Sequence, residues 1–119
     1  MTECNTQQDL CAFYRGDTIP FNFNFKDMNG DPIDITNMTL TFSMKEDPDD
    51  DTFILQESIT FPDIQDSRDG IGSMKILPDK TETLEPDVSY YYDFQLKTTS
   101  NDIFTVGAGK VKVLYDITT

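Results

Sequence analysis

Apolar and polar residues alternate along much of this chain. Every second residue from Ile19 to Phe25 is apolar, and the same period recurs over Thr39–Lys45 and Val88–Lys97. A period of two is typical of strands that bury one face. Weaker alternation predicts further strands at 53–61, 71–77, 103–106 and 110–115.

Turn residues separate these segments at intervals of about 8 to 12 residues. Asn29-Gly30 is a tight-turn signal, residues 62–69 read as a loop, and residues 78–85 allow one helical turn. Ile33 and Ile35 suggest a short strand or bridge, and Pro20 suggests an edge strand.

The last two strands flank Gly107-Ala108-Gly109 and form either a hairpin or a single bulged strand. No segment has the period of a helix of ten or more residues. We therefore predict an all-β, antiparallel β-sandwich of about seven to eight strands.

One local feature favours a sandwich over a barrel. Leu84 and Pro86 precede the strongest strand, in which Tyr90 and Tyr92 share one face. In a tyrosine corner, a Tyr near the start of a strand places its hydroxyl against the backbone a few residues upstream. We predict this structural role for Tyr90 or Tyr92, with Leu84 and Pro86 shaping the approach.

The first 14 residues show no clear period, and we interpret them as an N-terminal arm or short edge segment ahead of a domain at 15–119. Residues 1–10 lack the basic and apolar regions of a signal peptide, so synthesis in the cytoplasm is expected. Cys4 and Cys11 are then free thiols, or a disulfide if the mature protein meets oxidising conditions. The arm, with both cysteines, is a candidate contact to a neighbouring subunit.

The charge balance restricts the partners. The chain has 22 acidic and nine basic residues, for a formal net charge of -13. This charge repels phosphate backbones and anionic membranes, so neither nucleic acid nor membrane is expected as a partner. No apolar run is long enough to span a bilayer. Proteins with basic patches are compatible with this charge.

The residue types also restrict the chemistry. The chain has no His, which excludes His-dependent triads and mixed Cys–His zinc sites built from this chain alone. No carboxylate pair stands out among the 22 acids, so we expect no enzyme and no cofactor. Asp47, Asp49, Asp50 and Asp51 are weak calcium candidates, although a solvated loop explains them better. Tyr91, on the polar face of its strand, is a candidate interface residue.

Several short motifs resemble a known family. They are Tyr14–Thr18 ahead of an aromatic strand, Gly30–Thr36, Tyr90–Asp93 and Gly109–Val113. Together they resemble the immunoglobulin-like domain of phage baseplate upper proteins and related small tailed-phage virion proteins. The larger baseplate proteins continue into a stalk or receptor-binding part, which this sequence lacks. We therefore expect docking rather than receptor recognition.

The resemblance implies a non-enzymatic virion structural protein, made in the host cytoplasm and placed in the tail, baseplate or capsid as an accessory or decoration component. It would contact other virion proteins and form a homo-oligomer in the particle. The alternative is a free-standing adhesion or carbohydrate-binding module, with or without a dependence on calcium.

Overall fold

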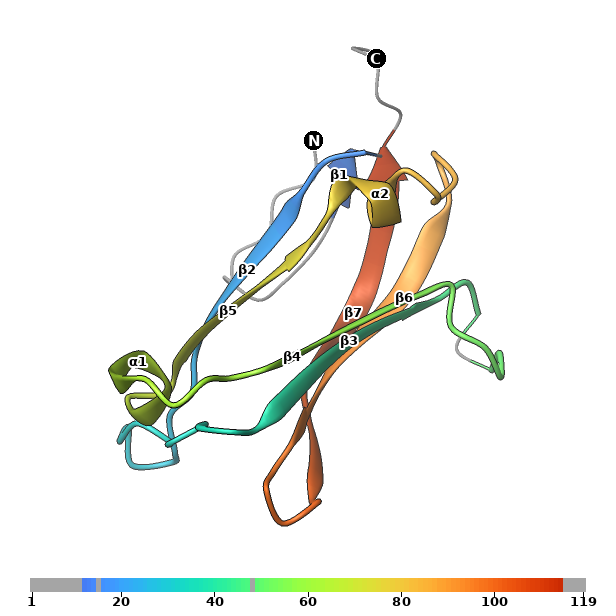
Figure 1. The fold of residues 1–119 in the computed structure, drawn as a ribbon. Helices are drawn as coiled ribbons and strands as arrows, with labels where there is room; N and C mark the ends of the chain where they lie inside the picture. Colours follow the sequence, from blue (N-terminus) through green and yellow to red (C-terminus); the bar gives the residue numbers. More distant parts are fainter. Residues whose placement is uncertain (1–11, 15, 48, 115–119) are drawn as a thin grey trace.

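The computed structural model describes residues 12–14, 16–47 and 49–114. Their secondary structure is almost entirely strand (Figure 1). The elements are β1 (Ala12–Tyr14), β2 (Ile19–Asn24), β3 (Thr39–Lys45), β4 (Leu55–Thr60), α1 (Gln65–Arg68), β5 (Ile71–Ile76), α2 (Pro78–Thr81), β6 (Ser89–Lys97) and β7 (Ile103–Leu114). Neither short helix of this described part has the length and apolar character needed to cross a membrane.

The strands form two sheets of unequal width. The large sheet has the order β1-β7-β6-β3-β4, and the small sheet consists of β2 and β5. All neighbours are antiparallel except β1, which pairs in parallel with residues 112–114 of β7. The predicted all-β sandwich is confirmed. The last three residues of the predicted arm form β1 and therefore belong to the large sheet.

The core lies between the sheets because alternate residues of each strand face inward. Neighbouring strands are in register, so Leu40 lies opposite Leu96 and Phe42 opposite Phe94, and all four side chains are buried. Phe21 of β2 meets Phe94 edge-on, with ring centroids 4.9 Å apart. Aromatic contacts thus join the small sheet to the large one.

The last strand is one continuous strand with a bulge, the second of the two predicted forms. The register between β6 and β7 shifts between Phe94 and Gln95. Gly109 lies opposite Tyr92, and a Cβ atom at Gly109 would approach the Tyr92 hydroxyl to 2.7 Å. Glycine at this position therefore makes room for the Tyr92 side chain.

The tyrosine corner is formed by Tyr90. Its buried hydroxyl oxygen accepts a hydrogen bond from the backbone N–H of Glu85 at 3.1 Å. Leu84 is buried and Pro86 is partly buried on the approach to β6. Asp87 adopts a positive φ of 65° and its N–H donates to the Val113 carbonyl at 2.7 Å, which directs the chain into β6.

Three predicted segments differ from the structure. The third strand spans Leu55–Thr60 rather than 53–61, and the predicted loop at 62–69 contains α1. Ile33 and Ile35 belong to no strand or bridge, and the isolated bridge nearby joins Lys26 to Pro32 instead. The N–H of Ile35 instead donates to the Ser67 carbonyl, so this segment packs against α1.

Candidate interaction surfaces

The outer face of the large sheet is polar and well hydrogen-bonded. Thr39 bonds to Thr60 and Thr41 to Ser58, each pair across the β3–β4 ladder with an oxygen–oxygen distance of 2.9 Å. These outward residues alternate with the core residues of the same strands, as a half-buried sheet requires.

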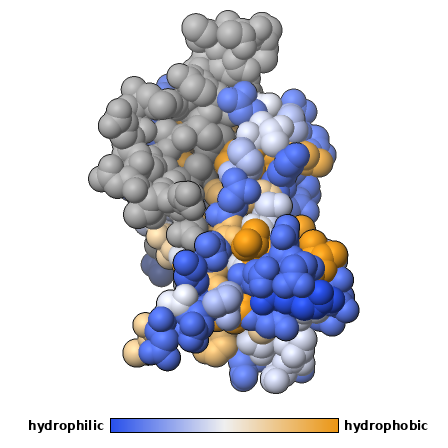
Figure 2. All heavy atoms as spheres, turned by 90° about the vertical axis from the view of Figure 1, so that its left-hand side faces the viewer, coloured by the Kyte–Doolittle hydropathy of each residue, from blue (hydrophilic) through white to orange (hydrophobic). Residues whose placement is uncertain are grey.

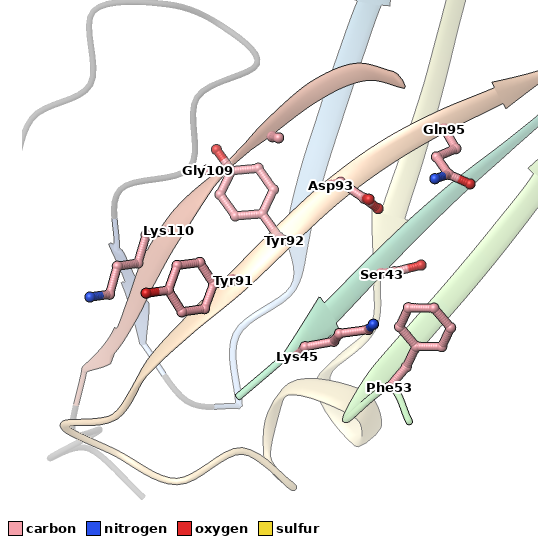
Figure 3. Close-up of a pocket in the computed structure, with 10 residues that line it drawn as sticks. Ser43, Lys45, Phe53, Tyr91, Tyr92, Asp93, Gln95, Gly109 and Lys110 are labelled. Atoms are coloured by element: carbon pink, nitrogen blue, oxygen red, sulfur yellow. The ribbon is translucent and has the colours of Figure 1, made fainter. Parts of the chain in front are cut away.

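A shallow depression crosses this face, and we call it the outer trough (Figure 3). Its volume is about 680 Å³. It is lined by Ser43, Lys45, Phe53, Tyr91, Tyr92, Asp93, Gln95, Ala108, Gly109 and Lys110. Most of these side chains come from β3, β6 and β7, and Phe53 comes from the segment before β4.

Two lysines lie over aromatic rings in the outer trough. The Nζ atom of Lys45 is 4.9 Å from the centroid of the Phe53 ring, and that of Lys110 is 5.3 Å from the centroid of Tyr91. Both distances suit a cation–π interaction. Lys45 Nζ also donates to the Asp50 carbonyl at 2.6 Å.

Asp93 lies on the β6 part of the trough and is partly buried. Burial raises the pKa of its carboxyl group above the usual value, and the nearby Lys45 charge partly opposes this effect. Desolvation penalises the charged form of the carboxylate, and Asp93 remains partly open to the trough.

A second hollow opens between the two sheets, and we call it the open-side groove. Its volume is about 510 Å³. It is lined by Phe23, Asn24, Phe25, Lys26, Ile33, Met38, Phe94, Leu96, Thr98, Phe104 and Val106. Phe104 lies opposite the buried Leu96 in the ladder, yet 56% of its surface is exposed, and Val106 is 40% exposed.

The width of the sheets explains this exposure. The small sheet has two described strands against five in the large sheet, and the β6–β7 hairpin extends beyond it (Figure 1). Among the described strands, β2 pairs only with β5, and β7 has no partner opposite β6 before residue 112. Within residues 12–14, 16–47 and 49–114, two strand edges without a hydrogen-bonded neighbour therefore flank an apolar groove.

Elsewhere the exposed apolar residues are scattered. Polar side chains predominate on the side turned to the viewer in Figure 2, with smaller apolar patches between them. Ile71 is exposed on β5, and Ile64 and Leu77 are exposed directly before α1 and α2. Single exposed apolar residues are normal on protein surfaces.

Two of the four aspartates proposed as weak calcium ligands accept hydrogen bonds from the backbone of their own loop. Asp47 Oδ1 accepts from the Asp49 N–H at 3.0 Å, and Asp50 Oδ2 accepts from the Asp47 N–H at 3.2 Å. Asp51 is exposed beside them. Across the described part of the chain, no three acidic or cysteine side chains gather into a potential metal site.

The other predicted site residues have different outcomes. Tyr91 is 39% exposed and lines the outer trough, where it is available to a partner. Cys4 and Cys11 lie outside the described residues. Lys110 and Asp93 of the trough and Phe104 of the groove were not predicted from the sequence as surface-site residues, because the pairing of distant strands determines their neighbours.

No family model matches the chain, and no curated protein is significantly similar to it in sequence. Its function is therefore inferred from the fold, the two surfaces and the chemistry of their residues.

Proposed function

We propose that this chain is a non-enzymatic structural protein of a bacteriophage particle, which docks on neighbouring particle proteins in the tail, baseplate or capsid. After synthesis in the host cytoplasm it becomes part of the virion. The starting point is the resemblance of its motifs to immunoglobulin-like virion domains, and two features of the fold support the proposal.

The first is strand order. In immunoglobulin-like sandwiches, strands C, F and G form one sheet and face B and E in the other. When the seven described strands are lettered in chain order, β3, β6 and β7 take the places of C, F and G, and β2 and β5 those of B and E. Two strands depart from the constant-type pattern, since β4 pairs with β3 and β1 with β7. The Tyr90 corner is a further shared feature.

The second feature is the open-side groove, which is the main structural support for docking on a neighbouring protein. Exposed Phe104 and Val106 lie next to the open edges of β2 and β7. An extended segment of a neighbouring protein can pair with such an edge while its apolar side chains enter the groove. Burial of apolar area supplies the affinity, and the alternating side chains supply the specificity.

The charge of the chain fits this mode of docking. A net charge of -13 keeps free subunits apart in solution and favours neighbours with basic residues around the contact. Because free subunits repel one another, they associate weakly in solution. The homo-oligomer forms when several copies bind to a neighbouring particle protein.

The proposal is tested by locating the chain. Particles of the phage that encodes it are purified by density gradient, analysed by mass spectrometry and labelled with a gold-conjugated antibody against the folded domain. We expect mass spectrometry to find the chain in a fixed copy number per particle. The gold label should lie at one position on the particle. Particles that lack the chain, from cells in which it is abundant and soluble, would refute the virion role.

A further inference from the structure

The outer trough contains two lysines and one carboxylate on a strongly acidic protein. Lys45 and Lys110 both line it, although the whole chain carries a net charge of -13. Neither lysine takes part in the ion pairs found among the described residues, which are Arg68–Asp63 and Lys80–Glu57. An ammonium group has three N–H donors, so donors of both lysines are available to a ligand.

The same trough contains acceptors and exposed rings. Asp93 and Gln95 lie on β6 next to Ser43 on β3. Phe53 is 47% exposed and Tyr91 is 39% exposed, so parts of both rings are accessible. The volume of about 680 Å³ lies within the range of small-ligand sites, which is about 300–1,000 Å³.

We propose that the outer trough binds a sugar acid, that is, a carbohydrate residue with a carboxylate beside its hydroxyl groups. The carboxylate accepts hydrogen bonds from Lys110 or from Lys45, which lie on opposite sides of Tyr91 (Figure 3), and the hydroxyl groups donate to Asp93 and Gln95. The C–H face of the sugar ring packs on Tyr91 or Phe53. This site is separate from the open-side groove and does not depend on the docking function.

The mixture of groups favours a sugar acid over other anions. A segment rich in Asp or Glu brings several carboxylates close to Asp93 and has no hydroxyl groups to donate to it. A nucleic acid brings a row of phosphates toward a chain of net charge -13. A neutral sugar leaves the two lysines unused. A sugar acid satisfies the donors and the acceptors together.

The test is an NMR titration of the full ¹⁵N-labelled chain at about 0.15 M salt, where charges more than about 8 Å apart are screened. The probes are trigalacturonate, its methyl ester and a hexaglutamate peptide. We expect trigalacturonate to shift the amide signals of Lys45, Tyr91, Asp93 and Lys110 with a millimolar Kd. In the methyl ester each carboxylate is replaced by a neutral ester group. The ester should bind roughly tenfold more weakly because it cannot form charge-assisted hydrogen bonds.

Two variants assign the binding to the trough. Lys110→Gln should weaken trigalacturonate binding roughly tenfold, by loss of one charge-assisted hydrogen bond. Lys97→Gln is the matched control, since Lys97 is an exposed lysine of β6 on the same face of the large sheet but outside the trough, and this variant should bind as the wild type does. Equal binding of the acid and its ester, tighter binding of hexaglutamate, or no shift with any probe would each overturn the proposal.

Discussion

The contact between Gly72 and Phe61 gives the sharpest test of the packing between the sheets. A Cβ atom at Gly72 would lie 2.4 Å from Cε1 and 2.9 Å from Cδ1 of Phe61. Phe61 cannot easily move away, because its ring is buried and its N–H and carbonyl are bonded to Met38 and Asn37. Gly72→Ala therefore forces a shift in the core.

The expected loss follows from two opposing terms. Overpacking of a well-packed core costs about 1–3 kcal/mol. The smaller conformational freedom of the unfolded Ala chain offsets about 0.4–1 kcal/mol of this. We predict a net destabilisation of about 1–2 kcal/mol, measured by urea unfolding, and a Tm lower by about 4–8 °C for a chain of this size.

Gly107→Ala is the matched control. A Cβ atom there would lie 3.5 Å from Phe94 Cδ2, which is an ordinary contact, so Gly107→Ala should leave stability unchanged or raise it by up to about 1 kcal/mol. Phe61→Leu added to Gly72→Ala should recover part of the loss, with a coupling energy of about 1 kcal/mol in a double-mutant cycle. Equal stability of the two alanine variants, or strictly additive effects in the cycle, would refute the assigned contact.

Three further predictions concern single groups. Tyr90→Phe should cost about 1 kcal/mol in chemical unfolding, because the Glu85 N–H loses its acceptor; an unchanged midpoint would show that water replaces it. Asp93→Asn should stabilise the fold at pH 7. The raised folded-state pKa of Asp93 means that protonation favours the fold, so the gain should shrink as the pH falls toward 4, and a gain independent of pH contradicts the assigned burial. Calcium at 1 mM should leave the Tm unchanged, because Asp47 and Asp50 accept hydrogen bonds within their own loop; a rise of several degrees would reveal a site.

The strands that the sequence predicted well are those with strong alternation. In β6, Tyr90, Tyr92, Phe94 and Leu96 are buried, as the period of two requires. The same rule failed at Phe53, which lies inside the predicted strand 53–61. The strand begins only at Leu55, after Ile54 bonds to the Met44 carbonyl, so Phe53 stands outside the ladder and lines the trough instead.

The two surfaces could not be read from the sequence because they depend on long-range pairing. Lys110 and Tyr91 are adjacent only through the register of β6 with β7. Phe104 follows the alternation of a buried residue, and its exposure results from the difference in width between the sheets. The alternation of apolar and polar residues predicts which face of the sheet a side chain occupies. Whether a strand of the other sheet covers that face depends on the whole fold.

The measurement that tests the docking function most directly is incorporation of groove variants into particles. A phage without its own copy of the gene is supplied with wild type, Phe104→Asp or Ile71→Asp, and the purified particles are quantified by mass spectrometry. Ile71 is 45% exposed and lies outside the groove, so its variant is the control, and melting curves confirm that each variant is folded. We predict normal incorporation of wild type and Ile71→Asp and a loss of at least tenfold for Phe104→Asp. Normal incorporation of folded Phe104→Asp would contradict docking through the open-side groove.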